Sequence, residues 1–292
     1  MSESIVVFSK GARERLRSIR HVALDMDGTI YLGSRLFPAT LPFLERLAQW
    51  GIAYTFLTNN SSKSRDDYWQ KLVAMGLPVT PEHILTSTHG LIDYLRNDLP
   101  GVRRLFILGT PCLHNEMGLH GYLCSDDAPD AVVVGFDTTI NYDRLCRAAW
   151  WIAQGKPFLA THPDLVCPTD QPTILVDCGA LCKALGAATG RTPTVIGKPH
   201  SRMLEPILRK TGLSAKQVAV VGDRLMTDIV MAKRAGALAV LVLTGEATLE
   251  DVAALPERER PDIVLSHVGL LGDLLAGREQ ESELCAPKEQ WK

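Results

Sequence analysis

The sequence lacks several features that mark whole classes of protein. Its seven cysteines include no CxxC pair and no spacing typical of a zinc site. No apolar segment approaches the roughly 20 residues that span a bilayer, so we expect no membrane partner. Lysine and arginine form no dense block and the formal net charge is −2, which argues against a nucleic-acid partner.

The N-terminal segment also lacks the order of a signal peptide, because its basic residues follow its short apolar run. Cys178 and Cys182 are best interpreted as small buried thiols. Together with the absent features, this interpretation predicts a reduced, cytoplasmic protein. No internal repeat is found, and no GxGxxG follows the first strong strand, which disfavours a dinucleotide enzyme.

Short apolar runs alternate with helical patterns along most of the 292 residues, which predicts an α/β fold with a largely parallel sheet. The length favours two domains or a core with an insertion. The expected strands are 21–25, 52–58, 194–197, 218–222, 239–243 and 263–265, and the expected helices are 41–50, 64–75, 201–211, 227–235 and 248–255.

The middle of the chain has its own alternation, with strands at 104–109, 131–135 and 158–160 and a helix near 142–154. We therefore expect a Rossmann-like core made of residues 1–88 and 188–277, with residues 89–187 inserted as an α/β cap domain. The polar, Glu- and Gln-rich stretch 278–292 is expected to be a disordered tail.

Four expected strands end in reactive side chains. Asp25 and Asp27 follow the first, Thr58, Asn59 and Asn60 the second, Lys198 the third, and Asp223 with Asp228 the fourth. In open α/β sheets the ligand crevice lies beyond the carboxyl ends of the strands. Carboxylates, a lysine and small amide donors together suit a phosphate group and Mg²⁺, whose charge would relieve the repulsion among the acids.

Each of these signals has an ordinary structural alternative. Asp27-Gly28 alone is more often a turn, and the residues after Thr58 alone are more often a cap and a turn. Lys198 alone is most often a surface lysine, and Asp228 alone suits the first turn of a helix. Their joint placement at successive strand ends favours a site.

The motifs DMDGT, TNN, the lysine of IGKP and GDRLMTD resemble, in order, the four motifs of haloacid dehalogenase superfamily phosphatases. The resemblance covers about residues 22–275, and the stretch 188–208 resembles the subfamily of NagD-type and 4-nitrophenylphosphatases. That subfamily implies a cap of the C2 type between the second and third motifs. Thr58 and Lys198 are 140 positions apart, which leaves room for such a cap.

The resemblance implies a Mg²⁺-dependent phosphatase that hydrolyses small phosphate monoesters (sugar phosphates, nucleotides or phosphoglycolate-like esters). Asp25 would be the nucleophile that forms an aspartyl-phosphate, and Asp27 the general acid and base. Mg²⁺ would be held by Asp25, the backbone carbonyl of Asp27 and Asp223, while Asp228 would hold a metal-bound water or Lys198. The implied phosphate-binding residues are Gly28, Thr58, Asn59, Asn60 and Lys198.

The implied substrate contacts of the cap are Phe136, Asp137, His162 and Cys167. Relatives often have Asn in place of His162 and Pro-Gly in place of Asp177-Cys178, so the chain departs from the family pattern twice. For His162 a loop hydrogen bond and a substrate contact are equally expected. A homodimer through the cap is implied, and a phosphotransferase, a phosphomutase or a non-catalytic binding protein remains the alternative.

Overall fold

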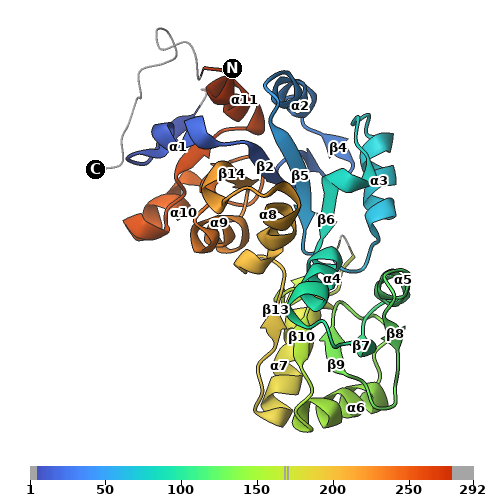
Figure 1. Cartoon of the computed structure of the whole chain (residues 1–292). Coiled ribbons are helices and arrows are strands. Elements are labelled where there is room, and N and C mark those ends of the chain that lie inside the picture. The colour runs from blue at the N-terminus through green and yellow to red at the C-terminus, as the bar shows by residue number, and fades with distance from the viewer. Residues whose placement is uncertain (1–4, 168, 170, 278–292) are drawn as a thin grey trace. The chain divides into compact units, whose positions relative to one another are not determined.

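The chain forms an α/β structure made of two compact units (Figure 1). The computed structural model describes residues 5–167, 169 and 171–277. The first unit comprises the chain up to Leu57, Trp69–Ile84 and the chain from Ile207 onward, and the second comprises Thr58–Tyr68 and Leu85–Pro206. In the described residues no helix is both long and apolar enough to cross a membrane.

The larger sheet has seven strands in the order β1-β16-β15-β14-β2-β5-β6. Their bounds are β1 Val6–Phe8, β2 His21–Asp25, β5 Ala53–Thr58, β6 Ile84–Thr86, β14 Val218–Gly222, β15 Leu238–Val242 and β16 Ile263–Leu265. From β16 to β5 neighbouring strands pair in parallel, and β1 pairs antiparallel with β16. Every residue of β14 and β15 is buried, as expected for parallel strands covered on both faces.

The register of this sheet decides where the acidic residues lie. In the pairing of β14 with β2, Val221 lies opposite Leu24. In the pairing of β2 with β5, Asp25 lies opposite Leu57. The residues that directly follow β14 therefore emerge beside the end of β2, at the carboxyl edge of the sheet.

The helices of the first unit cover this sheet. They are α1 Ala12–Ser18, α2 Thr40–Gln49, α3 Arg65–Ala74, α8 Glu205–Thr211, α9 Val230–Ala235, α10 Leu249–Ala254 and α11 Val268–Ala276, with α3 and α8 crossing the unit boundary. α2 buries Phe43, Leu44 and Leu47 on one face and packs against α11. A short hairpin of β3 Tyr31–Leu32 and β4 Arg35–Leu36 follows β2.

The second unit has a five-stranded parallel sheet in the order β13-β10-β9-β7-β8. The strands are β7 Arg104–Leu108, β8 Leu123–Cys124, β9 Ala131–Val134, β10 Phe158–Ala160 and β13 Thr194–Val195, and the helices are α4 Ser87–Asp98, α5 Pro111–Leu119, α6 Tyr142–Ala153 and α7 Cys178–Thr189. A separate antiparallel pair, β11 Val166–Cys167 and β12 Leu175–Val176, precedes α7.

Alternate residues along these strands pack into two cores. Leu105 and Val133 join the apolar side chains of α4 and α5 in one core. Phe106 and Val132 join those of α6 and α7 in the other. Since side chains of a strand point alternately to opposite faces, α4 and α5 cover one face of the sheet and α6 and α7 the other.

Several predicted elements are confirmed, and two are corrected. The strands expected at 21–25, 218–222 and 263–265 occupy those residues. The strand expected at 194–197 is shorter, and it belongs to the smaller sheet because it pairs with β10. The helix expected from residue 227 begins instead as a π-helix at Leu225.

The second unit therefore extends past the expected boundary at residue 187, and it also takes in Thr58–Tyr68. Division into a core and an independently folding cap stays a prediction. The expected tail, residues 278–292, lies outside the described residues.

Candidate active site

Three aspartates from separate segments of the first unit meet at the carboxyl edge of the larger sheet. Asp25 ends β2, Asp223 directly follows β14, and Asp228 lies in the π-helix Leu225–Ile229. One carboxylate oxygen of each lies within 4.8 Å of those of the other two. Asp223 and Asp228 are buried and Asp25 is partly buried. The sheet register thus brings together three of the predicted site residues.

The electrostatics of Asp223 are unfavourable without a cation. Burial raises the pKa of its carboxyl group, and the nearby Asp228 carboxylate raises it further. The hydrogen bond from the Glu246 N–H lowers this pKa but does not outweigh the other two effects. Its Oδ1 is buried and accepts no hydrogen bond from any described residue. A buried oxygen of this kind is unfavourable unless something binds it. Hard divalent cations such as Mg²⁺ prefer clustered carboxylate oxygens, so the residues fit the implied metal.

Glycines leave the space that these carboxylates occupy. A Cβ atom at Gly28 would lie 2.3 Å from Asp223 Oδ2, and one at Gly245 would lie 2.0 Å from the same oxygen. A Cβ atom at Gly222 would lie 2.2 Å from Asp228 Cγ. Gly28 also has a φ of +83°, which favours glycine. These positions therefore admit no side chain while the cluster stays intact.

Arg224 is a neighbour of the cluster to which the sequence analysis gave no role. Its Nε lies 3.0 Å from Glu246 Oε2. Burial lowers the pKa of Arg224, but Glu246, Asp223 and Asp25 outweigh burial and raise it overall. The guanidinium thus places positive charge beside the acids. Its position directly after Asp223 in GDRLMTD is the sequence signal that marks it.

Asp27 lies apart from the acidic cluster. Met26 is buried between Asp25 and Asp27, and the Asp27 side chain is exposed. Its Oδ1 accepts a long hydrogen bond, 3.4 Å, from the Gly33 N–H. An exposed carboxylate two residues from Asp25 suits a group that exchanges protons with a substrate and water. Its role as general acid, and its backbone carbonyl as a ligand, stay predictions.

In the second unit, the structure brings Asn59 and Lys198 together. Asn59 Nδ2 donates to the main-chain oxygen of Lys198 at 2.9 Å and to Asp164 Oδ2 at 3.0 Å. Lys198 is only 4% exposed. Thr58 Oγ1 accepts from the Asn60 N–H at 3.2 Å, and Asn60 Oδ1 accepts from Ser62. The side chains of Thr58 and Asn60 therefore stabilise a turn after β5, which is the ordinary structural role given above as the alternative to a site.

Phe136 and Asp137, two of the predicted substrate contacts, form hydrogen bonds and an ion pair with other residues of the second unit. The Phe136 N–H donates to Ser61 Oγ at 3.2 Å. Asp137 Oδ1 accepts from Thr139, and its Oδ2 lies 3.0 Å from an Arg144 guanidinium nitrogen. Phe136 and Asp137 are buried. Cys167 is partly buried on β11. Contact of these residues with a substrate stays a prediction.

His162 is part of a buried ion pair. Its Nε2 lies 2.9 Å from Asp177 Oδ1, and its Nδ1 lies 2.8 Å from Thr161 Oγ1. The same Asp177 oxygen accepts from the Cys178 N–H at the start of α7. His162 is 2% exposed. The structure thus shows the loop hydrogen bond, and contact of His162 with a substrate stays a prediction. The two departures from the family pattern are thus partners, because His162 binds the residue that replaces the expected proline.

This pairing gives stability a specific pH dependence. Burial lowers the pKa of His162, but neighbouring Cys178 and Asp177 outweigh it and raise the pKa to about 9 from the ordinary 6.5. A pKa raised on folding contributes stability that is complete below 6.5 and is lost as the pH rises through 9. The whole contribution is about 3 kcal/mol.

We therefore expect the difference in free energy of unfolding between the parent protein and His162→Asn to shrink between about pH 6.5 and 9.5. Urea unfolding across this range measures it. Asp177→Asn should reduce the same pH dependence, because Asp177 is one of the groups that raise the pKa of His162. A difference that stays constant with pH would show that His162 is neutral in the folded protein.

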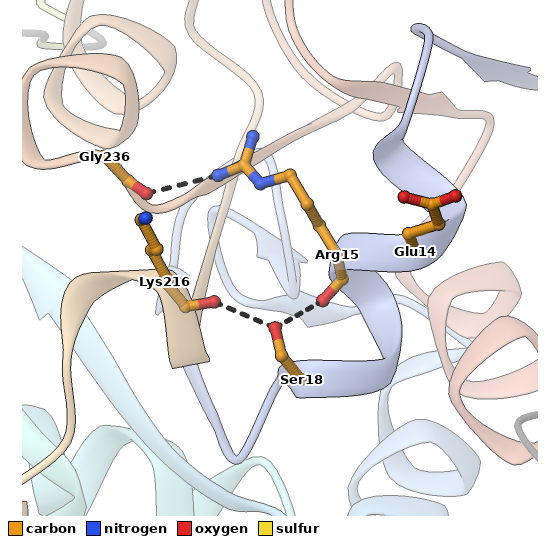
Figure 2. Close-up of a pocket in the computed structure, with 5 residues that line it drawn as sticks. All are labelled: Glu14, Arg15, Ser18, Lys216 and Gly236. Carbon is orange, nitrogen blue, oxygen red and sulfur yellow. Dashed lines mark hydrogen bonds between the residues drawn. The ribbon is translucent and has the colours of Figure 1, made fainter.

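A surface hollow in the first unit holds none of the predicted site residues. It is lined by Glu14, Arg15, Ser18, Lys216 and Gly236 (Figure 2). Ser18 Oγ donates to the main-chain oxygens of Arg15 and Lys216, at 2.8 and 3.1 Å, and Arg15 donates to the Gly236 oxygen at 3.2 Å. These bonds join α1 to neighbouring segments, so Arg15 and Ser18 have a structural role in this hollow.

Comparisons with known proteins agree with the motifs. A family model described as haloacid dehalogenase-like hydrolase matches residues 22–122, and one described as HAD-hydrolase-like matches residues 195–271. An acid sugar phosphatase of Staphylococcus aureus is 32% identical over 238 residues, which cover 81% of this chain and 91% of that protein.

Solved structures of relatives have the same fold. A 4-nitrophenylphosphatase from Thermotoga maritima matches with a TM-score of 0.82 and 39% identity, over 89% of this chain and 98% of that one. NagD from E. coli matches with a TM-score of 0.79 and 29% identity, over 86% and 97%. A glycerol phosphate phosphatase from Mycobacterium tuberculosis, in complex with calcium, matches with a TM-score of 0.78 and 31% identity, over 88% and 76%.

These matches confirm the resemblance to the NagD and 4-nitrophenylphosphatase branch, and they confirm the expected fold class. Because a relative 32% identical aligns over 81% of this chain and 91% of its own length, the chain belongs to the family of haloacid dehalogenase-like hydrolases.

Proposed function

We propose that the chain is a divalent-cation-dependent phosphatase that hydrolyses small-molecule phosphate monoesters through an aspartyl-phosphate on Asp25. The observation that carries this proposal is the cluster of Asp25, Asp223 and Asp228 at the carboxyl edge of the larger sheet. Three clustered acids repel one another, so the cluster favours a hard cation and, with it, a phosphate ligand. The relatives named for acid sugar, 4-nitrophenyl and glycerol phosphate substrates support the same reaction.

The proposed reaction has two displacements at phosphorus. In the first, a carboxylate oxygen of Asp25 bonds to phosphorus while the bond to the ester oxygen breaks, and Asp27 gives its proton to the leaving oxygen. In the second, Asp27 takes a proton from water, the water oxygen bonds to phosphorus, and the bond to Asp25 breaks. Inorganic phosphate leaves, and both aspartates return to their starting state.

The cation proposed is Mg²⁺, held by Asp25, Asp223 and the main-chain carbonyl of Asp27. When bound it would offset the negative charge of the acids and of the phosphoryl group. Asp228, whose carboxylate lies within 4.8 Å of the other two, would hold a cation-bound water or Lys198. Calcium in the relative from Mycobacterium tuberculosis supports a divalent ion in this family.

Thr58, Asn59 and Lys198 are proposed to bind the phosphoryl oxygens. Thr58, through its hydroxyl group, and Asn59, through its main-chain N–H, would donate to these oxygens, and Lys198 would offset their charge. The hydrogen bond from Asn59 to the Lys198 main chain supports a shared task, because it fixes the two segments to each other. Gly28 and Asn60 complete the proposed phosphate-binding set.

Hydrolysis is favoured over the alternatives. Transfer to an acceptor other than water would need that acceptor to reach the aspartyl-phosphate, and a binding protein would need no general acid at Asp27. The family of the chain is named for hydrolases. A cytoplasmic location, a homodimer through the second unit and the choice among phosphate esters stay predictions.

The roles of Asp25 and Asp27 predict different losses. Asp25→Asn removes the nucleophile and should lower kcat by about 10,000-fold or more for every substrate. Asp27→Asn removes the proton donor, so its loss of kcat/KM, which reports on the first displacement, should be about tenfold smaller with 4-nitrophenyl phosphate, whose leaving group needs no proton, than with a sugar phosphate. Phosphate release from both esters, with and without Mg²⁺, measures these effects.

Asp143→Asn, on α6, is the matched control and should retain full activity. The assignment of the nucleophile would be wrong if Asp25→Asn kept near-normal turnover. Equal losses for both esters in Asp27→Asn would contradict its role as the acid. Phosphate appearing on an added alcohol instead of free in solution would favour a transferase.

The space at Gly245 gives an independent prediction. A methyl group at this position would overlap the Asp223 carboxylate, so Gly245→Ala should displace it and lower kcat/KM by roughly 100-fold. Gly101→Ala is the control, because a Cβ atom there meets no atom within 4 Å. Assays at saturating Mg²⁺, with circular dichroism to verify folding, measure the effect. Equal activity of the two variants would show that the position of Asp223 does not matter.

A further inference from the structure

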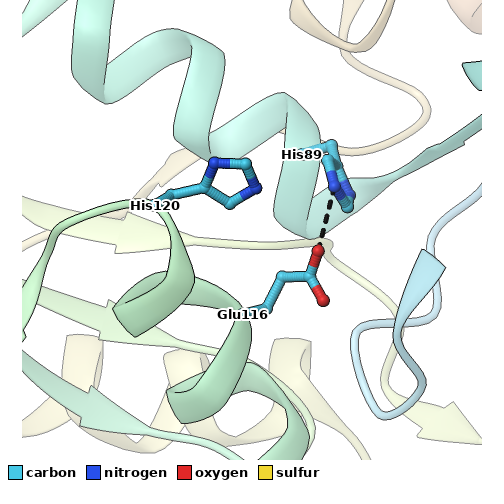
Figure 3. A group of neighbouring side chains, drawn as sticks. All are labelled: His89, Glu116 and His120. Carbon is cyan, nitrogen blue, oxygen red and sulfur yellow. Dashed lines mark ion pairs between the residues drawn. The ribbon is translucent and has the colours of Figure 1, made fainter. Parts of the chain in front are cut away.

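A second group of potential metal ligands lies within the second unit and has no role in the proposed reaction. His89 is in the first turn of α4, Glu116 is in α5, and His120 caps the end of α5 (Figure 3). One ligand atom of each lies within 4.8 Å of those of the other two. Glu116 and His120 are four residues apart, about one helical turn, but His89 lies 27 residues before Glu116, so no three-ligand spacing motif marks the group.

The side chains converge on one point. His89 Nε2 lies 3.0 Å from Glu116 Oε1, and a ring nitrogen of His120 faces the same region (Figure 3). The two imidazole rings are edge to face, with their centroids 5.6 Å apart. The side chains of His89 and Glu116 are only 6% and 11% exposed. Two imidazoles and a carboxylate thus face one another, with His89 and Glu116 largely buried and His120 partly exposed.

A hydrogen bond on the far side of His89 orients its ring. Its Nδ1 lies 2.9 Å from Thr86 Oγ1, the residue that caps α4. With the proton on Nδ1, the Nε2 lone pair points at Glu116. Metal-binding histidines are commonly held in this way by a partner on the other ring nitrogen.

The positively charged side chain of Arg96 disfavours the binding of a cation by His120. Its guanidinium lies 3.0 Å from His120 Nδ1, and a guanidinium only donates, so this nitrogen accepts and the proton lies on Nε2. A metal at Nε2 needs that proton to move to Nδ1. Arg96 is exposed and can turn into solvent, so the obstacle is small. Arg65, which also acts on His89, adds positive charge nearby, and Asp66 offsets it.

We propose that His89, Glu116 and His120 form a binding site for a zinc-like divalent cation, with water in the fourth position. Two imidazole nitrogens and one carboxylate oxygen suit Zn²⁺ in tetrahedral geometry and do not suit Mg²⁺, which takes oxygen ligands. The bound ion would link the first turn of α4 to the end of α5. It would therefore stabilise the face of the second unit that these helices cover.

A hydrogen bond between His89 and Glu116 is the simpler account of two of the three residues. In that account His120 is held by Arg96 and by its edge-to-face contact with His89, and it is no ligand. The same account predicts that removal of His120 changes nothing in metal binding. The two accounts are therefore distinguished by the dependence of metal binding on His120.

Co²⁺ is the probe of choice, because tetrahedral Co²⁺ absorbs visible light far more strongly than the octahedral ion. The full chain, stripped of metal and saturated with Mg²⁺, is titrated with Co²⁺ and then with Zn²⁺. We expect intense visible bands that one equivalent of Zn²⁺ abolishes. His120→Ala and Glu116→Gln should weaken Co²⁺ binding by at least about tenfold, whereas Arg96→Met should tighten it several-fold.

His114→Gln, in the same helix as Glu116, is the matched control and should bind Co²⁺ like the parent protein. Thermal unfolding of His120→Ala without metal verifies that the variant folds. Three results would overturn the proposal: no intense visible bands, bands that persist in His120→Ala, or a sulfur charge-transfer band that assigns the ion to cysteines. Phosphatase activity plays no part in any of these readouts.

Discussion

Electrostatic repulsion among the carboxylates of Asp25, Asp223 and Asp228 is the constraint on which the rest of this structure depends. Parallel pairing of β14 with β2 brings Asp25 and Asp223 to one edge of the sheet, and the π-helix turns Asp228 toward them. Glycines at 28, 222 and 245 leave the space that the Asp223 and Asp228 side chains occupy, and a Cβ atom at any of the three would overlap one of these side chains. A fold that concentrates negative charge in this way gains stability only when a cation shares the site, and the proposed chemistry uses that cation.

The second unit also contains buried charged side chains, but they are of opposite sign. His162 and Asp177 form an ion pair in the interior and fix the loop before α7. Asn59 joins the turn after β5 to the segment that carries Lys198. The cluster of His89, Glu116 and His120 joins α4 to α5. Polar contacts between segments distant in sequence thus hold the turn after β5, the loop before α7 and the α4–α5 pair.

Much of the fold and the acidic cluster could be predicted from the sequence because both follow from local patterns. Apolar runs that stop at an acid mark the ends of buried strands, and this placed Asp25 and Asp223 correctly at one edge of a sheet. The approach of Asp228 depends on a π-helix, which no spacing rule indicates. The sheet to which β13 belongs depends on pairing with a strand more than 30 residues away. The partners of His162 and His89 likewise follow from tertiary packing and not from any motif.

Thermal unfolding of the parent protein and of Asp223→Asn, each with and without Mg²⁺, tests the central claim most directly. Mg²⁺ at 100 times its dissociation constant should stabilise the parent by about 2.7 kcal/mol, seen as a rise in Tm. Asp223→Asn removes one of the repelling charges, so without Mg²⁺ it should be at least as stable as the parent, and it should gain little from the ion. The account would be contradicted if Mg²⁺ left the parent unchanged or stabilised both proteins equally.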